Sequence, residues 1–317
     1  MTMTQTMRTL TASLIDYAGL FPPAKLDMAT SVENYARYLR SEHAPMLGRF
    51  ICPVSRLDEL TRHGAMLMPG TYATSGYREM ADDVAPWRIS AIIDAELPAC
   101  LDRIDAFNAH HSDEAHGLAR VDAIEMRVKT PGDIDDALDE IPEDIYPAFE
   151  VPQDVVINGD PRGFIAAMAG NGCSGKIRCG GVEASMIPSS GAIARFIIAC
   201  AQGAVPFKAT AGLHHPVRAV YPLTYDQDPP RATMHGFLNV FLAAAMVRTH
   251  RIDEARTVEI LDDTDPSSFD FTDEHAGWRD LSVDLIQLSR VRETFALSYG
   301  SCSFEEPVED LRGLALL

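Results

Sequence analysis

The sequence predicts a single α/β domain folded as a (β/α)8 TIM barrel. Short β-branched or apolar runs alternate with segments of helical periodicity along most of the 317 residues, and eight such units can be counted. Strands that alternate with helices pair in parallel through right-handed crossovers, and eight of them close into a barrel more naturally than into an open sheet. No G-x-G-x-x-G motif follows the first run, which disfavours the competing doubly wound fold.

Each barrel strand is expected in a short β-branched or apolar run. In chain order these runs are 12–16, 49–52, 89–94, 121–128, 145–151, 176–179, 206–210 and 258–262. Helices are expected where apolar residues recur at helical spacing, at 28–40, 55–63, 98–110, 133–139, 161–169, 189–202, 233–250 and 280–298. An extended polar loop, 214–230, follows the seventh strand, and a non-helical tail, 301–307, lies near the C-terminus.

The composition is that of a globular protein with a sizeable core, since 46% of the residues are apolar and 23% are charged. The 27 basic residues are outnumbered by 46 acidic ones, which gives a formal net charge of -19. Such a surface repels phosphate backbones and anionic lipid headgroups. We therefore expect neither nucleic acid nor a membrane as a partner.

The cysteines indicate a reducing compartment. The six cysteines form no C-x-x-C pair and have no His partner at zinc-finger spacing, and several lie in apolar runs typical of buried thiols. No signal peptide is expected at the N-terminus, and the apolar run 236–247 is too short to span a membrane and is interrupted by Asn239. We expect a cytoplasmic protein. Because the helix 237–247 is apolar nearly all round, it is either buried or a subunit interface, and we expect a homo-oligomer.

Polar residues at the carboxyl ends of the strands mark the expected active site, because reacting groups lie there in a (β/α)8 barrel. Only four of the 27 basic residues are lysines, and three of them lie on or just beyond predicted strands. A buried ammonium or guanidinium group is costly without a partner, so such groups persist only where they are paired or used. The strand-end candidates are Asp94, Glu125, Arg127, Lys129, Glu150, Lys176, Arg178 and Lys208.

Lys176, Arg178 and Lys208 are expected to form a cationic floor that holds a small anionic substrate. Glycines after both strands would leave backbone N–H groups open to a carboxylate or phosphate. The expected substrate-binding residues are Asp94, Arg127, Arg178, Gly180, Gly181, Thr210, Gly212 and His215. A plainer interpretation is a barrel lined by structural ion pairs, such as Glu125 with Arg127 or Glu150 with Lys176.

Lys208 carries the most specific hypothesis. Its neighbours Phe207, Ala209 and Ala211 are apolar, and two other cations are expected close by. Desolvation and repulsion by like charge both lower the pKa of a lysine toward neutrality. A neutral amine can attack a carbonyl carbon and form a Schiff base.

The segment Phe207-Lys208-Ala209-Thr210-Ala211-Gly212 is similar to the Lys-Thr-Ser-Thr-Gly strand that carries the Schiff-base lysine of deoxyribose-phosphate aldolases. These barrel enzymes keep a second lysine, followed by Gly-Gly, on a neighbouring strand. The resemblance implies that Lys208 forms the imine and that Lys176 lowers its pKa. In those aldolases the second lysine comes after the Schiff-base strand, whereas Lys176 comes before Lys208.

His214 and His215 follow the seventh strand in a loop that Pro216 stiffens. Two adjacent imidazoles at the rim favour a proton shuttle or a metal ligand. Because adjacent side chains on an extended loop point apart, a metal site would need Glu150, Asp94 or another carboxylate to join one of them. The segment 16–23 after the first strand is interpreted as a rigid turn. Cys302 has no identifiable His partner, which disfavours a nucleophilic role.

We therefore expect an enzyme that acts on a small anionic carbonyl compound, an aldolase-like lyase that forms a Schiff base on Lys208 and needs no cofactor. In this mechanism Lys176 tunes the pKa of Lys208, Arg178 binds the carboxylate or phosphate, and Glu150 or His214 moves protons. Two alternatives stay open. One is a lyase or isomerase that uses a divalent metal ion on a carboxylate substrate, and the other is a barrel that binds an anion without turnover.

Overall fold

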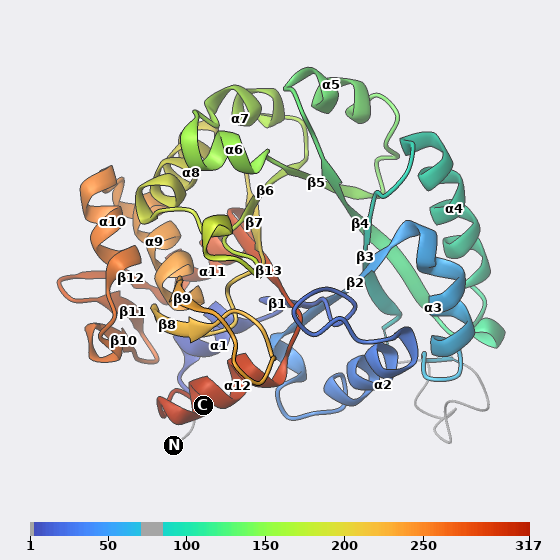
Figure 1. Ribbon diagram of the computed structural model, residues 1–317, viewed down its shortest axis with the longest axis horizontal. Helices are drawn as coiled ribbons and strands as arrows, with labels where there is room; N and C mark the ends of the chain where they lie inside the picture. The colour runs from blue at the N-terminus through green and yellow to red at the C-terminus, as the bar shows by residue number, and fades with distance from the viewer. Residues whose placement is uncertain (1–2, 71–84) are drawn as a thin grey trace.

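A computed structural model, which describes residues 3–70 and 85–317, shows a closed barrel of eight parallel strands with helices around it (Figure 1). The strands, in order around the barrel, are β1 (Ile15–Tyr17), β13 (Ala296–Ser301), β7 (Phe207–Thr210), β6 (Ser174–Arg178), β5 (Tyr146–Glu150), β4 (Ala119–Arg127), β3 (Trp87–Ile92) and β2 (Leu47–Pro53). The predicted (β/α)8 barrel is confirmed.

Strand register brings the polar strand ends together. Glu150 on β5 is aligned with Lys176 on β6, and Lys176 is aligned with Lys208 on β7. Side chains of aligned residues on neighbouring parallel strands point to the same face of the sheet. Three charged side chains of adjacent strands therefore enter the barrel at one level.

Helices form the outer layer, and their starts follow from capping residues in the sequence. Asp27, Ser189 and Asp284 each accept a backbone N–H of the first turn, which satisfies a donor that the helix itself leaves unpaired. The outer helices of the first part of the chain are α1 (Gln5–Thr11), α2 (Met28–Tyr38), α3 (Leu57–Gly64), α4 (Leu97–His110), α5 (Gly132–Leu138) and α6 (Gln153–Asn158). Those of the second part are α7 (Arg162–Met168), α8 (Ser190–Gly203), α9 (Phe237–His250), α10 (Glu254–Asp262), α11 (Leu285–Thr294) and α12 (Glu305–Gly313).

The expected eighth strand at 258–262 is wrong, because these residues belong to α10. Thr257, Ile260 and Leu261 are buried at helical spacing, so a short apolar run that fits a strand also fits one face of a helix. The eighth barrel strand is β13, which overlaps the end of the helix expected at 280–298. The tail expected to be non-helical instead contains the start of α12.

Two small antiparallel sheets lie outside the barrel. The expected polar loop after β7 holds a hairpin of β8 (Ala219–Pro222) and β9 (Arg231–Met234). A three-stranded sheet of β10 (Phe269–Phe271), β11 (His275–Trp278) and β12 (Leu281–Asp284) precedes α11. In Figure 1 the hairpin lies on the same side of the molecule as α12.

The apolar helix α9 is covered within the chain. Its residues 237–247 are all buried, and it packs against α8, α10, α11 and the three-stranded sheet. Asn239, which interrupts its apolar sequence, donates to the carbonyls of Ile260 and Asp263 and accepts from the backbone N–H of Arg218. The apolarity of this helix is therefore explained by burial inside one subunit and gives no support to a homo-oligomer.

One described helical stretch, Ala184–Gly203, is long and apolar enough to cross a membrane by length and composition alone, and 50% of its apolar 18-residue window is buried. It contains α8, which packs in the helical layer against α6, α7, α9 and α10. Packing against these neighbouring helices therefore explains its apolar character.

Candidate functional site

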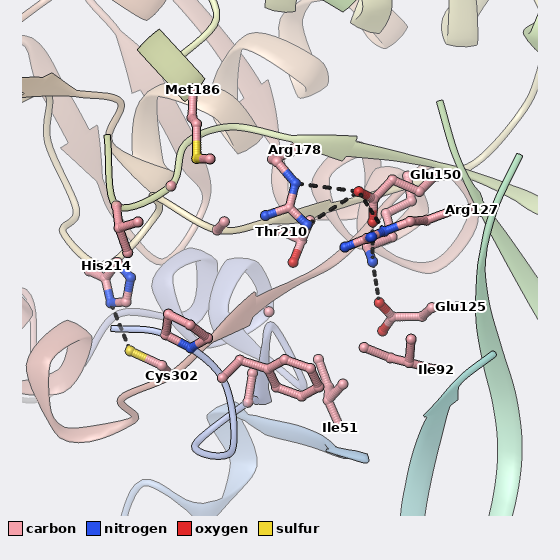
Figure 2. A pocket seen from close by; sticks show the side chains of 18 of the residues that line it. Ile51, Ile92, Glu125, Arg127, Glu150, Arg178, Met186, Thr210, His214 and Cys302 are labelled. Atoms are coloured by element: carbon pink, nitrogen blue, oxygen red, sulfur yellow. Dashed lines mark hydrogen bonds and ion pairs between the residues drawn. The ribbon is translucent and has the colours of Figure 1, made fainter. Parts of the chain in front are cut away.

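A cavity of about 330 Å³ opens at the carboxyl ends of the barrel strands (Figure 2). Its walls combine apolar side chains, among them Ile51 and Ile92, with charged and polar ones. The charged side chains that line it are Glu125, Arg127, Glu150, Lys176 and Arg178. A cavity of this size with a few convergent polar groups suits a small molecule, and in (β/α)8 barrels this end carries the active site.

Five buried charged side chains form a lysine–carboxylate cluster at and below the cavity floor, namely Asp16, Glu125, Glu150, Lys176 and Lys208. Lys208 Nζ lies 2.6 Å from Asp16 Oδ2 and 2.7 Å from Glu125 Oε1. Lys176 Nζ lies 2.7 Å from Glu125 Oε2 and 2.6 Å from Glu150 Oε2. Each ammonium therefore sits between two carboxylates, and Glu125 links the two lysines.

Glu125 is the centre of this cluster. Burial would raise the pKa of its carboxyl group, but the charges and hydrogen bonds of Lys176 and Lys208 hold that pKa well below its usual range. Ser90 Oγ also donates to Glu125 Oε1 over 2.9 Å. Glu125 is thus an anion, and the interpretation that it pairs with Arg127 is wrong.

Asp16 closes the cluster on the other side of Lys208. Its Oδ2 accepts from Ser298 Oγ over 2.7 Å, and its Oδ1 accepts from the backbone N–H of Arg49 over 2.8 Å. These bonds tie together β1, β2 and β13. From the sequence, Asp16 was assigned only to the start of a turn. The signal that could have identified it as a site residue is its position at the end of the first predicted strand.

The expected low pKa of Lys208 is wrong. Burial alone would lower that pKa, but the charges and hydrogen bonds of Asp16 and Glu125 outweigh burial and raise it. The expectation counted the neighbouring cations and missed the two carboxylates that lie against the amine. Lys208 is moreover not among the residues that line the cavity.

Lys176 does line the cavity, and Arg178 lies above it at the end of β6. The predicted ion pair of Glu150 with Lys176 is confirmed. Glu150 Oε1 also accepts from Arg178 Nη2 over 3.2 Å, and Figure 2 shows both side chains turned toward each other. Charges of Lys176 and Arg178 outweigh burial and lower the pKa of Glu150.

Arg127 lies at the rim and not deep in the barrel. Its Nε is 3.9 Å from Glu150 Oε1, and 79% of its side chain is exposed. Lys129, which follows β4, is exposed as well. An exposed pair at this distance contributes little to stability, so Arg127 is free to turn toward a ligand.

The glycines after β6 and β7 have a packing role that the sequence did not reveal. A Cβ atom on Gly180 would lie 2.8 Å from Gly212 Cα, and one on Gly212 would lie 2.7 Å from Gly180 Cα. The two loops therefore touch backbone to backbone. Gly181, Thr210 and Ala211 line the cavity beside this contact.

Five predicted site residues are not among those that line the cavity, namely Lys208, Gly180, Gly212, Asp94 and His215. Asp94 is exposed and accepts hydrogen bonds from the backbone N–H and the hydroxyl group of Ser55. His215 stacks on Tyr221 with ring centroids 3.5 Å apart, and its Nδ1 lies 2.6 Å from Asp310 Oδ2. Neither is among the residues that line the cavity, so substrate-binding roles for Asp94 and His215 lose their support.

His214 lines the cavity and has an unforeseen set of partners. Its Nδ1 lies 3.2 Å from Glu306 Oε2 and 3.9 Å from Cys302 Sγ, which also lines the cavity (Figure 2). The expectation that Cys302 has no His partner is wrong. The two residues are 88 positions apart in the sequence, and no local spacing rule connects them.

The residues expected for a metal site do not share one set of contacts. Glu150 pairs with Lys176, His214 with Glu306, and Asp94 bonds to Ser55. Among residues 3–70 and 85–317, no group of three or more His, Cys, Asp or Glu side chains is arranged to hold a metal ion.

Comparisons of this chain with protein-family models, with curated proteins and with solved structures gave no match. The class of protein is therefore defined by fold and site alone. It is a parallel (β/α)8 barrel with a buried lysine–carboxylate cluster under a cavity at the carboxyl ends of its strands.

Proposed function

We propose that this protein is an enzyme that acts on a small anionic carbonyl compound through an imine on Lys176, with lyase chemistry of the aldolase type. One observation carries the proposal. Lys176 is a buried amine that lines the cavity and lies within 2.7 Å of Glu125 and Glu150, two carboxylates that can exchange protons with it. Lys208, which the sequence favoured, is held away from the cavity by Asp16 and Glu125.

The nucleophile in this mechanism is the neutral amine of Lys176, so a carboxylate must first take its proton. Glu150 is suited to this, because its Oε2 is 2.6 Å from Lys176 Nζ and its Oε1 accepts from Arg178. An anionic substrate that draws Arg178 away removes part of what keeps the Glu150 pKa low. Substrate binding then promotes proton transfer from Lys176 to Glu150.

The overall step is balanced without a cofactor. A carbonyl group and the lysine ammonium give a protonated imine and water, with no net change of charge. Cleavage of the neighbouring carbon–carbon bond sends its electron pair into the imine nitrogen, while a base removes the proton of the hydroxyl group on the departing carbon. Glu150 and His214 both line the cavity and are the candidates for that base.

The anionic end of the substrate is assigned to the β6 and β7 side of the cavity. Arg178 of β6 provides positive charge there and Thr210 of β7 provides a hydroxyl group, while Arg127 adds a second cation from the end of β4. Arginine binds carboxylate and phosphate groups through paired N–H donors. Local cations are needed in this protein because its formal net charge of -19 disfavours anions elsewhere on the surface.

The assignment to Lys176 agrees with the deoxyribose-phosphate aldolases in strand order but not in motif, because the segment similar to Lys-Thr-Ser-Thr-Gly carries Lys208 and Gly180-Gly181 follow Lys176. In that family the second lysine follows the Schiff-base strand, and Lys208 on β7 follows Lys176 on β6. Lys208 then has the role of the second lysine, with Glu125 between the two amines.

A cytoplasmic location fits the six cysteines, which are all free and buried.

Borohydride trapping tests the proposal. The protein is incubated with pyruvate or with glycolaldehyde phosphate, reduced with sodium borohydride, and digested for peptide mass spectrometry. We expect a reduced adduct on Lys176. Lys25 and Lys129 are exposed and serve as internal controls for non-specific reduction. The matched variants Lys176→Arg and Lys208→Arg keep the charge that each carboxylate pair requires.

Each outcome decides between the candidate functions. Loss of the adduct in Lys176→Arg but not in Lys208→Arg supports the proposal, and an adduct on Lys208 overturns the choice of lysine. Modification that is equal at Lys25, Lys129 and Lys176 indicates surface chemistry only. Stabilisation of the protein by both probes without any adduct supports the second candidate, a barrel that binds an anion without turnover, because Arg178 and Arg127 suffice for binding.

A further inference from the structure

Four side chains meet at the rim of the cavity, and we call them the rim thiol cluster: Tyr225, His214, Cys302 and Glu306. Of these, the proposed mechanism uses His214 alone, as a candidate base. They come from separate parts of the chain. His214 follows β7, Tyr225 lies between β8 and β9, Cys302 follows β13, and Glu306 is in the first turn of α12.

The contacts of this cluster converge on the thiol and the imidazole. His214 Nδ1 is 3.9 Å from Cys302 Sγ and 3.2 Å from Glu306 Oε2. Tyr225 Oη donates to Glu306 Oε2 over 2.8 Å and lies 3.7 Å from Cys302 Sγ. Cys302 and His214 both line the cavity, so the thiol is within reach of a molecule bound there.

The electrostatics of the cluster favour a charged His214. Burial lowers the pKa of this imidazole, but Cys302 and Glu306 outweigh burial and raise it to about 10. The pKa of Glu306 is lowered by His214 and Tyr225 against the effect of burial. Tyr17 of β1, Tyr299 of β13 and His215 are further titratable groups that face the cluster.

Cys302 differs from the other five cysteines of the chain. All six are buried, but among the described residues only Cys302 lies both beside a histidine and on the cavity wall. Burial raises the pKa of the Cys52, Cys173, Cys179 and Cys200 thiols, which makes them poor nucleophiles. These cysteines are matched internal controls for any test of Cys302.

We propose that Cys302 and His214 form a thiolate–imidazolium pair, a second nucleophile of this cavity that captures a small aldehyde as a thiohemiacetal. In this pair His214 holds the proton of Cys302; the Sγ–carbon bond forms as the carbonyl π bond breaks, and the carbonyl oxygen takes that proton from His214. No electrons are gained or lost overall, and the adduct reverses by the same path. The proposal concerns the thiol alone and stands without the imine on Lys176.

Alkylation kinetics test the reactivity of the thiol. The protein is treated with iodoacetamide between pH 5 and 9, and peptide mass spectrometry follows each cysteine. An ordinary thiol is only a few per cent ionised at pH 7, so we expect Cys302 to react about tenfold faster than an ordinary thiol at that pH. In His214→Asn the rate at Cys302 at pH 7 should fall about tenfold.

A second measurement identifies the electrophile. Carbon-13-labelled glycolaldehyde should give a thiohemiacetal resonance in the wild type and in Lys176→Arg, but not in Cys302→Ser. The same aldehyde should slow the alkylation of Cys302 in both proteins. Since Lys176→Arg cannot form an imine, this result separates a failure of the lysine chemistry from a failure of the thiol chemistry.

Several results would overturn the proposal. They are alkylation of Cys302 no faster than that of the four control cysteines, an unchanged pH profile in folded His214→Asn, or no resonance that depends on Cys302. If His214→Asn does not fold, the wild-type pH profile decides alone, because an ion-paired thiol keeps its reactivity below pH 7 and an ordinary thiol does not.

Discussion

Lys176 and Glu150 face each other from adjacent strands at the cavity floor, with Nζ 2.6 Å from Oε2. The other carboxylate oxygen of Glu150 accepts from Arg178. A ligand that attracts Arg178 therefore acts indirectly on the amine, since it changes how strongly Glu150 holds a proton. In the proposed mechanism, substrate recognition and activation of the nucleophile are coupled through this one carboxylate.

Replacement of Lys208 by methionine should cost about 3–5 kcal/mol of unfolding free energy, because it leaves Asp16 and Glu125 buried with one fewer cation. Urea denaturation monitored by circular dichroism measures the change. Lys129→Met is the control, since Lys129 is exposed and its removal should stay within about 0.5 kcal/mol. Equal stability of the two variants would contradict a structural role for the buried pair.

The lysine–carboxylate cluster should make stability fall in acid. Glu125 and Glu150 both have a pKa below the ordinary value of 4.5, so the folded state binds fewer protons than the unfolded state. Their contribution is present above pH 4.5 and is lost as the pH falls through the folded-state values. Unfolding free energies from urea titrations between pH 7 and 3 should decrease, and less steeply in Glu125→Gln.

The control for this acid dependence is Asp136→Asn, because Asp136 is exposed on α5. The unfolding free energy of Asp136→Asn should fall with decreasing pH as steeply as that of the wild type. A Glu125→Gln variant with that same slope would show that Glu125 is not the group that titrates.

Alanine at position 212 should disturb the contact between the two strand-end loops. Gly212 has a φ of +73° and its Cβ would meet Gly180 Cα at 2.7 Å, whereas Gly170 has a φ of +81° and open space around it. Gly170→Ala should therefore show only the cost of the left-handed conformation, about 1–2 kcal/mol. Gly212→Ala should cost about 1–3 kcal/mol more by urea denaturation. Equal costs would argue against a close backbone contact.

Removal of Arg178 should weaken the binding of anions. A hydrogen bond to a charged group contributes about 1.5–3 kcal/mol, so the affinity of Arg178→Met for glycolaldehyde phosphate should fall about tenfold to a hundredfold. Isothermal titration calorimetry gives the dissociation constants. Arg127→Met is the comparison, with a smaller loss expected because 79% of the Arg127 side chain is exposed. A larger loss of affinity in Arg127→Met than in Arg178→Met would indicate that the anion binds at the rim, beside Arg127.

Much of the barrel could be predicted because periodicity is a local property. Seven of the eight strands lie where short apolar runs occur, and the expected strands carry Glu150, Lys176 and Lys208 as observed. The eighth strand could not be found in this way, since the run that contains Val258 is a buried helix face in α10. A short apolar segment fits either structure until its packing partners are known.

The sequence by itself determined the alternation of strands and helices, the acidic surface and the few lysines placed at strand ends. Only the tertiary structure decided which charges meet. Asp16 and Lys208 are separated by 192 positions, and they are brought together by closure of the barrel between β1 and β7 through β13. The pKa of a buried amine depends on the atoms within a few ångströms of it, and those neighbours come from strands that no local pattern can pair.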